Sequence, residues 1–261
     1  MEAEKGCAAF TKAVLDKGLP DDAQAQEFLF DMVPELKAMV GFEQNNIHHV
    51  YDVWRHTMKA LSSAGDDAIV RLAVLFHDIG KPQCYTEDER GTGHFYGHGA
   101  VSAGMTGRIM DRLGFDHDTR EKVVELVKYH DLDLHGKHKS VRTWLNRLGK
   151  EQFYRLLEVF RCDAAGQNPE YLEADNARTD RVEAVLDEIL ATENCFRIKD
   201  LAVTGHDLIR MGCPQGRQVG EMLQRLWEAV SSGAVSNEPE LLLDMAREWL
   251  CAYCTKTDGK Y

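Results

Sequence analysis

Histidine and aspartate are the residues of this sequence whose types and spacing are best suited to chemistry. The chain contains 11 histidines, and several of them fall in or at the ends of successive predicted helices. One aspartate directly follows such a histidine, and another lies late in a further predicted helix. Imidazole and carboxylate groups on facing helices are the ligands from which helical bundles build metal sites. The candidate metal ligands are His56, His77, Asp78, His98, His130 and Asp163.

The pair His77–Asp78 is the strongest part of this pattern. It follows the apolar segment 72–76, which predicts a helix that is buried on most sides. A carboxylate at the C-terminal end of such a helix faces the negative end of the helix dipole. Because an uncompensated buried carboxylate would cost several kcal/mol or stay protonated, a bound divalent cation is the expected compensation.

The other His–Asp pairs and the remaining histidines are expected to have plainer roles. The pairs at 117–118 and 206–207 stand at helix starts, where Asp118 or Thr119, and Thr204, are expected to cap the helix. His94 falls in a glycine-rich loop. The histidines expected to be solvated at polar segment edges are His48, His49, His135 and His138.

The elements that must position the candidate ligands are helices. Apolar residues recur at three- and four-residue spacing through nearly every segment, which predicts an all-α protein of about ten helices. Gly80, as a left-handed cap, and Pro82 are expected to end one of these helices. The segment 84–96 is expected to form a loop or small hairpin, placed to act as a lid. The clearest helical patterns cover 46–63, 67–79, 98–113, 171–193, 217–231 and 239–252.

Composition and charge restrict the classes of function. The 261 residues, 44% hydrophobic and 28% charged, predict a folded globular protein. The 31 Lys and Arg residues against 43 Asp and Glu residues give a net charge of −12, which disfavours broad nucleic-acid binding. No stretch approaches the roughly 18 consecutive apolar residues of a membrane-spanning helix, so we expect no membrane association.

The start of the sequence and its cysteines indicate the compartment in which the protein is expected. The acidic start of the chain lacks the pattern of a secretory signal, and the odd number of 7 scattered cysteines fits a reducing compartment. A cytoplasmic protein is therefore expected. The pair Cys251 and Cys254 has no second ligand pair after it, so these residues are expected to be plain thiols.

Several stretches of the sequence resemble a known family. His56, the segment 77–82 and Asp163 look like the ligand set of the HD-domain metal-dependent phosphohydrolases. The stretches 46–57, 71–82, 93–98 and 203–208 resemble the C-terminal, HD-containing half of bacterial CCA-adding enzymes (tRNA nucleotidyltransferases) and their poly(A) polymerase relatives. Nothing resembles the nucleotidyltransferase head of those polymerases, so we do not predict nucleotide addition.

The resemblance implies a helical bundle and a division of the chain into three parts. A stand-alone HD module is expected over 46–195, after an N-terminal helical segment over 1–45 and before a C-terminal helical extension over 196–261. The apolar stripe of the extension, at Met222, Leu223, Leu226, Trp227 and Val230, is expected to be core or dimer packing. The oligomeric state stays open.

The resemblance also implies how the ligands are shared between ions. A first metal would be held by His56, His77, Asp78 and Asp163, and a second by His98 and His130, with Asp78 bridging the two ions. Mixed histidine and aspartate ligands suit one or two divalent ions of Mn, Fe, Co, Ni or Zn. No other cofactor is expected.

Three further residues receive roles around that metal site. Lys81, which matches the lysine of the family's HDxGK stretch, would neutralise a phosphate oxygen, although a helix-dipole cap is the simpler alternative. Asp131 would orient His130 or protonate a leaving group. Asp52, four residues before His56, is a candidate partner for its ring. The expected catalytic residues are therefore Asp78, Lys81 and Asp131.

The expected function is hydrolysis of a small nucleotide phosphoester, by a nucleotidase or a 2′,3′-cyclic nucleotide phosphodiesterase. The main alternative is a non-catalytic module that binds tRNA or nucleotides, for which Arg142, Arg147, Lys150 and Arg155 would supply a basic strip. A signalling nucleotide such as guanosine tetraphosphate is a further substrate class. The acidic net charge favours a small substrate over tRNA.

Overall fold

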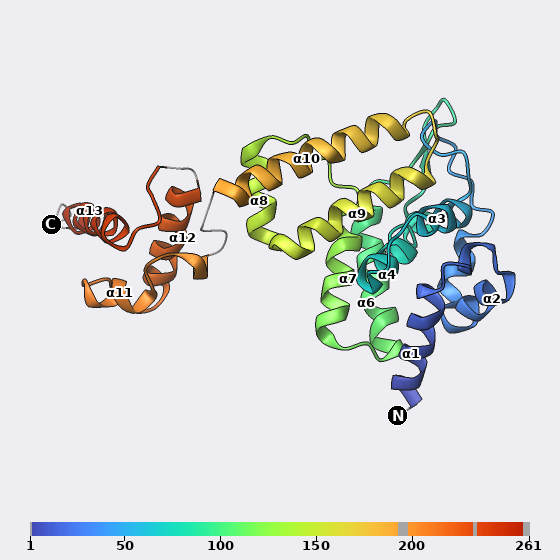
Figure 1. Ribbon diagram of the computed structural model, residues 1–261, viewed down its shortest axis with the longest axis horizontal. Helices are drawn as coiled ribbons and strands as arrows, with labels where there is room; N and C mark the ends of the chain where they lie inside the picture. Colours follow the sequence, from blue (N-terminus) through green and yellow to red (C-terminus); the bar gives the residue numbers. More distant parts are fainter. Residues whose placement is uncertain (1, 193–197, 232–233, 258–261) are drawn as a thin grey trace. The chain divides into compact units, whose positions relative to one another are not determined.

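The chain is mainly helical in both of its compact units (Figure 1). The computed structural model describes residues 2–192, 198–231 and 234–257. Over these residues it contains 13 α-helices and a single two-stranded sheet, so the all-α prediction is confirmed. The first unit comprises residues 1–136 and 150–183, and the second comprises residues 137–149 and 184–261.

The first unit holds every candidate ligand and is built from helices around one core. The helix α4 lies at its centre, because it contacts α1, α3, α6, α7 and α9. From Val70 to Phe76 every side chain of α4 is buried. The elements of this unit are α1 (Glu2–Leu15), η1 (Leu19–Asp21), α2 (Ala23–Met32), η2 (Pro34–Met39), α3 (Val53–Ser62), α4 (Ala68–Phe76), α5 (Lys81–Cys84), β1 (Thr86–Glu87), β2 (Gly93–His94), α6 (His98–Leu113), α7 (His117–Tyr129), α9 (Lys150–Gly166) and most of α10 (Leu172–Thr192).

A buried guanidinium fastens α1 to this core. The side chain of Arg71 on α4 is 1% exposed and donates hydrogen bonds to the carbonyls of Val14 (2.7 Å), Asp16 (3.2 Å) and Ala64 (3.2 Å). Carbonyl groups at the ends of helices lack partners within the helix. Arg71 therefore satisfies the end of α1 and the connection between α3 and α4 together.

Two predicted helix boundaries are wrong. The helix predicted over 46–63 begins only at Val53, because the carboxylate of Asp52 caps it by accepting from the backbone N–H of Arg55 at 2.8 Å. Gly80 is not a left-handed cap, since its φ is −87°, and α5 follows it with Pro82 in the first turn. A Cβ at Gly80 would lie 2.7 Å from the backbone N of Ser102, so close packing against α6 explains the glycine.

Other local predictions are confirmed. The segment 84–96 contains the antiparallel hairpin of β1 and β2, with Thr86 opposite His94. The helices predicted over 98–113 and 217–231 match α6 and α12 at both ends. The cap expected at Asp118 or Thr119 is wrong, because Asp116, two residues before Asp118, accepts from the N–H of Thr119 and caps α7.

The second unit has a small apolar core of its own. Its elements are α8 (His138–Leu148), the end of α10, η3 (Ile198–Asp200), α11 (Gly205–Arg210), α12 (Arg217–Ser231) and α13 (Pro239–Thr257). Met222 and Leu226 of the predicted apolar stripe are buried in this core, and Leu223, Trp227 and Val230 pack against it, so the prediction of core packing is confirmed. Thr204 and Asp207 form a capping box at the start of α11, which confirms a capping role there.

Some predictions fall on parts of the chain that the structure does not describe. The predicted boundary between residues 195 and 196 lies within 193–197, outside the described residues, and the division into 1–45, 46–195 and 196–261 stays a prediction. The side chains of Cys251 and Cys254 also lie outside the described residues. Among the helices that are described, none has the length and apolar character needed to cross a membrane.

Candidate metal centre

The six candidate ligands come together inside the first unit, although they are spread over residues 56–163. One ligand or one pair comes from each of α3, the end of α4, α6, the end of α7 and α9. They form two groups in which the ligand atoms lie within 4.8 Å of one another. The first group is His56, His77 and Asp163, and the second is Asp78, His98 and His130. Three of the four histidines stand at helix ends: His77 follows α4, His98 begins α6 and His130 follows α7.

The first group is compact and buried. The Nε2 atoms of His56 and His77 are 3.0 Å apart, and Oδ1 of Asp163 lies 3.0 Å from the former and 3.4 Å from the latter. Both imidazoles are buried, whereas the Asp163 side chain is 19% exposed. Nε2 of His56, Nε2 of His77 and Oδ1 of Asp163 thus converge from α3, the end of α4 and α9.

Asp78 faces both groups. Its Oδ1 lies 3.4 Å from Nε2 of His98 and 3.5 Å from Nε2 of His130, which are themselves 3.0 Å apart. Its other oxygen, Oδ2, lies 3.4 Å from Nε2 of His56 and 3.2 Å from Nε2 of His77. One carboxylate therefore presents one oxygen to each pair of imidazoles.

The hydrogen bonds of the imidazoles determine which ring nitrogen is free. Nδ1 of His77, His98 and His130 lies 2.7 to 2.8 Å from the carbonyl oxygen of the residue three positions earlier. A carbonyl only accepts, so each Nδ1 carries a proton, and in the neutral ring the lone pair is then on Nε2. Two Nε2 lone pairs 3.0 Å apart need a cation between them, and Oδ1 of Asp78 has no hydrogen-bond partner among the described residues. This donor set fits a divalent transition metal in each group.

The charges of the site also favour a bound cation. Burial would raise the pKa of Asp78 and of Asp163, but the neighbouring imidazoles hold both well below the usual range of a carboxyl. Burial would lower the pKa of His77, yet the carboxylates of Asp78 and Asp163 raise it to about 10. Two buried carboxylates thus stabilise positive charge on their neighbours, and a bound cation would supply that charge in place of protons.

Two glycines allow the helices that carry the ligands to approach closely. A Cβ at Gly166, the last residue of α9, would lie 2.7 Å from the carbonyl oxygen of His56 and 2.9 Å from its Nδ1. A Cβ at Gly99 on α6 would lie 3.1 Å from the carbonyl oxygen of Lys128 on α7. Ala at either position would push apart two helices whose side chains must meet.

Lys81 is a buried part of the site, with a side chain that is 5% exposed. Its Nζ lies 2.7 Å from Oδ2 of Asp78, donates to Oε1 of Gln44 at 2.8 Å, and is 3.4 Å from Nε2 of His49. The residue begins α5, so the helix-dipole cap at a C-terminus is wrong. Lys81 offsets part of the charge of Asp78.

His49 and Gln44 reach the site although neither was expected there. The expectation that His49 is solvated is wrong: it precedes α3, and its ring centroid is 5.3 Å from that of His56. Burial, together with the charge of Lys81, lowers the pKa of His49 to about 3, so its imidazole is neutral. The seven-residue spacing from His49 to His56 is the one signal in the sequence that could have placed His49 here, and Gln44 has no such signal.

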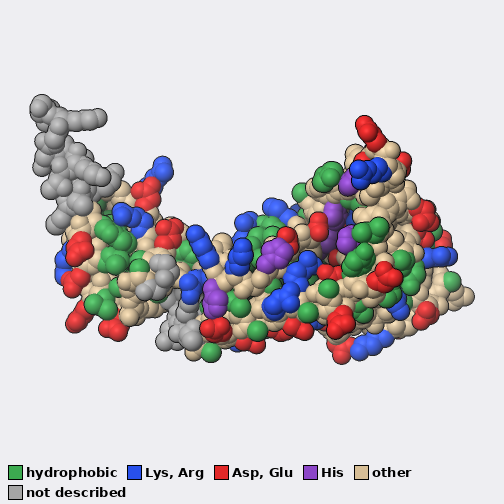
Figure 2. Space-filling view, turned by 90° about the horizontal axis from the view of Figure 1, so that it is seen from above, with side chains coloured by type: hydrophobic (Ala, Val, Ile, Leu, Met, Phe, Trp, Pro, Cys, Tyr) green, Lys and Arg blue, Asp and Glu red, His purple; other side chains and the backbone are tan. Residues whose placement is uncertain are grey.

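The remaining candidates lie around the groups. Asp131 is exposed and lines a pocket with His130 and Asp163, but it belongs to neither group. Asp52 caps α3, and Nδ1 of His56 has no hydrogen-bond partner among the described residues, so the predicted Asp52–His56 contact is wrong. His94 is in the hairpin, where its ring stacks on Tyr96. Figure 2 shows histidine side chains gathered beside acidic and basic ones on one face.

Comparison with known proteins relates the chain to tRNA nucleotidyltransferases. It is 29% identical over 239 residues to the A-adding tRNA nucleotidyltransferase of Deinococcus radiodurans, covering 87% of this chain and 52% of that protein. It is 30% identical over 219 residues to the CC-adding tRNA nucleotidyltransferase of Thermus thermophilus, covering 80% and 47%. It is 27% identical over 168 residues to a bifunctional uridylyltransferase/uridylyl-removing enzyme of Cereibacter sphaeroides, covering 52% and 17%.

The extent of these matches differs between this chain and its relatives. The chain spans about half the length of the two tRNA nucleotidyltransferases. Residues 102–246 match the family described as "tRNA nucleotidyltransferase domain 2 putative". Because this match covers more than half of the chain, the protein belongs to the tRNA nucleotidyltransferase domain 2 family.

Proposed function

We propose that the first unit is an HD-type metal-dependent phosphohydrolase that hydrolyses a phosphoester of a small nucleotide. The observation that carries the proposal is Asp78, whose two oxygens face two pairs of imidazole Nε2 atoms. A carboxylate between two such pairs has the arrangement needed to bridge two ions. Ligands with this chemistry suit Mn, Fe, Co, Ni or Zn.

The residues of the chain have distinct tasks in this proposal. Metal bound by His56, His77, Asp78 and Asp163, and by His98 and His130 with Asp78, would supply Lewis acidity and an activated water. The backbone carbonyls that accept from Nδ1 of three of these histidines hold the rings in the ligand tautomer. Gln167 donates to Oδ2 of Asp163 at 3.0 Å and orients that carboxylate.

Two further residues act on charge and on protons. Lys81 keeps Asp78 ionised and holds its Oδ2 in place, through a buried contact of 2.7 Å. Asp131 lines the pocket beside His130, where an exposed carboxyl is available to exchange a proton with a leaving group. Lys81 thus acts on the metal ligand Asp78, whereas Asp131 acts on the substrate.

Two observations support a small nucleotide as the substrate class. The net charge of −12 disfavours a polyanion, and the pocket that reaches both ligand groups has a volume of about 200 Å³. The relatives are named for reactions of nucleotidyl groups, and one is named as a uridylyl-removing enzyme. Removal of a nucleotidyl group and hydrolysis of a nucleotide phosphoester both break a bond at phosphorus.

A second candidate function is a non-catalytic module that binds tRNA or nucleotides, which the names of the two tRNA nucleotidyltransferases favour. The basic strip expected for it is incomplete. Nε of Arg155 lies 2.7 Å from Oδ2 of Asp67, so this guanidinium is already engaged by a carboxylate. Arg142 and Arg147 belong to the second unit, whereas Lys150 and Arg155 belong to the first.

The test combines elemental analysis of the purified chain with a screen of each metal against 2′,3′-cyclic nucleotides, mononucleotides and bis(p-nitrophenyl) phosphate. We expect one or two metal ions per chain, hydrolysis of at least one substrate, and loss of both in Asp78→Ala. The matched control is Asp180→Asn, because Asp180 pairs with Arg161 on the surface of the same unit. Bound metal without turnover, together with salt-dependent tRNA binding, would instead establish the binding module.

A further inference from the structure

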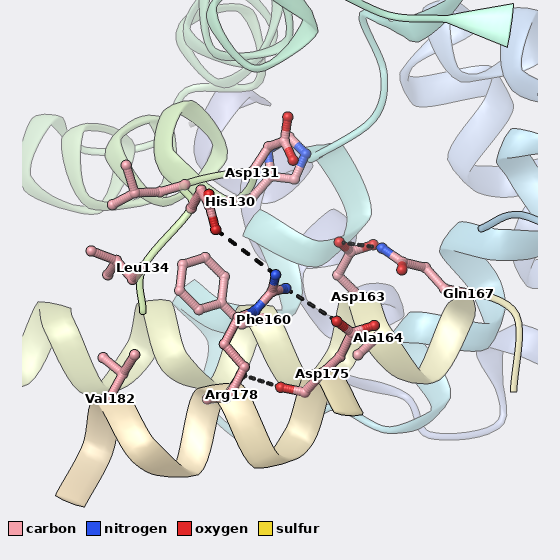
Figure 3. Close-up of a pocket in the computed structure, with 13 residues that line it drawn as sticks. His130, Asp131, Leu134, Phe160, Asp163, Ala164, Gln167, Asp175, Arg178 and Val182 are labelled. Atoms are coloured by element: carbon pink, nitrogen blue, oxygen red, sulfur yellow. Dashed lines mark hydrogen bonds and ion pairs between the residues drawn. The ribbon is translucent and has the colours of Figure 1, made fainter. Parts of the chain in front are cut away.

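The pocket beside the ligand groups is formed by three segments of the first unit (Figure 3). They are residues 130–134, the end of α9 and the first half of α10. Its lining includes His130 from the second ligand group and Asp163 from the first. A molecule in this pocket therefore lies next to both groups at once. This is where the part of a substrate beyond its reacting phosphate would lie.

Arg178 on α10 is the one Lys or Arg side chain among the described residues of the lining, and two carboxylates already hold it. Its guanidinium lies 3.2 Å from Oδ1 of Asp175 and 3.9 Å from Oδ1 of Asp133. Figure 3 shows the guanidinium between Phe160 on one side and Asp163 and Asp175 on the other. The charge of Arg178 is thus offset before any ligand arrives.

The rest of the lining is acidic or apolar. Apart from the ligand Asp163, the pocket contains the carboxylates of Asp131, Asp133 and Asp175, so three acidic groups face a single guanidinium. Ionised carboxylates only accept hydrogen bonds. They attract hydroxyl and amino groups and repel a phosphate. Phe160, Leu134 and Val182 add apolar surface suited to the face of a base or sugar.

The volume restricts the ligand further. At about 200 Å³, the pocket is smaller than the roughly 300 to 1,000 Å³ of sites that enclose a drug-sized molecule. It holds one moiety of a substrate. Of the moieties of a nucleotide, the hydroxylated and aminated nucleoside matches the acceptor groups, and a second phosphate does not.

We propose that this pocket receives the uncharged nucleoside of a substrate that carries a single phosphate. Arg178 is a positioning residue that holds Asp133 and Asp175 as hydrogen-bond acceptors. The inference rests on the proposed function, because it places the reacting phosphate at the ligand groups. It adds that a phosphate elsewhere on the nucleoside is rejected by the pocket.

The experiment compares inorganic phosphate, the tighter-binding of 5′-AMP and 3′-AMP, and adenosine 3′,5′-bisphosphate on the full chain loaded with Mn²⁺. Compounds that are hydrolysed are compared by their kcat/KM values. Compounds that are not hydrolysed are compared by their Kd values, measured by calorimetry. We expect the monophosphate to be preferred over the bisphosphate by at least about tenfold, since a like-charge contact costs this much or more. Hydrolysis of p-nitrophenyl phosphate reports separately on the proposed function.

Variants of the lining decide between a positioning role and a structural one. Asp175→Asn and Arg178→Gln should each lower the ratio of monophosphate to p-nitrophenyl phosphate use, or of monophosphate to phosphate affinity, by about tenfold. A merely structural defect would lower both members of the ratio alike. Asp180→Asn, on the same helix and paired with Arg161, should leave the ratio unchanged.

Two results would overturn the inference. One is a bisphosphate that is used or bound as well as the monophosphate. The other is an Arg178→Gln variant that loses the bisphosphate selectively, which would make the pocket a phosphate subsite. If p-nitrophenyl phosphate and the nucleotides are all left intact by the metal-loaded chain, the proposed function fails. The affinities then still test the pocket by themselves.

Discussion

Replacing Gly166 by Ala tests whether the close approach of α9 to α3 forms the first ligand group. The added Cβ would lie 2.7 Å from the carbonyl oxygen of His56 and 2.9 Å from its Nδ1, so one helix must shift by several tenths of an ångström. Overpacking of this kind costs about 1 to 3 kcal/mol, and Ala returns less than about 1 kcal/mol of helix propensity at a helix end. We expect the first unit to lose about 1 to 2 kcal/mol of stability.

The same shift separates Oδ1 of Asp163 from Nε2 of His56, which lie 3.0 Å apart. Disturbing the support of a ligand lowers metal affinity by about 10- to 100-fold. Titration of the metal-free chain should therefore show weaker binding at one of two sites, although Gly166→Ala removes no ligand. Hydrogen exchange of peptides from α3 and α9 measures the stability of the first unit separately from that of the second.

The matched control is Gly104→Ala on α6, where the nearest atom to the added Cβ is a flexible Arg108 nitrogen at 3.6 Å. This variant should gain about 0.5 to 1 kcal/mol, as Ala in place of Gly does inside a helix, and bind metal normally. The reasoning is refuted if Gly166→Ala keeps both the stability and the metal affinity of the unchanged chain.

Three further predictions follow from other parts of the structure. Arg71→Met should destabilise the first unit by about 3 kcal/mol in hydrogen exchange, because buried carbonyls lose their donor, and Arg71→Lys should recover only part of this. Cys162 should react with iodoacetamide at pH 8 far more slowly than the partly exposed Cys7, since burial followed by the charge of Glu158 raises the pKa of its thiol to about 12. Equal rates would contradict that burial. Hydrogen bonds from Thr204 and the charge of Arg210 lower the pKa of Asp207 to about 2, below the roughly 3.9 of an unfolded chain. The contribution of Asp207 is therefore full above that value and lost as the pH falls towards 2, and circular dichroism of Asp207→Asn should lack this part of the acid transition.

The sequence predicted the helices well where a local signal marks their ends. α6 begins after Gly97 and ends before Gly114, both in the left-handed region, and its predicted range is the observed one. The start of α3 was misjudged because the pattern of apolar residues continues upstream through 46–52. There Asp52 caps the helix, and in the segment before it the carbonyl of Ile47 accepts a hydrogen bond from Asn168 instead.

The candidate site was also predictable only where the sequence carries a local signal. His77 and Asp78 were selected because they end an apolar helix, and the other four ligands because of their places in successive predicted helices and the resemblance to the HD-domain phosphohydrolases. The contacts of Gln44 and His49 with Lys81 join residues that are 37 and 32 positions apart in the sequence. The role of Gly80 also depends on Ser102, a neighbour that only tertiary packing supplies. Pairings of this kind have no local pattern to reveal them.

The arrangement of the ligands links the fold of the first unit to its proposed chemistry. Asp78 and Asp163 bring two negative charges into the interior, and Lys81 offsets only one of them. Without a cation the balance rests on protonated imidazoles, whereas a metal must displace those protons to bind. Because the ligands come from α3, the end of α4, α6, α7 and α9, a bound ion joins helices that are far apart in the chain. Any ligand that binds only the folded state adds to its stability by mass action. The residues that make the metal-free core electrostatically unfavourable are thus the ones through which metal binding would stabilise it, which is why the site and the centre of the bundle coincide.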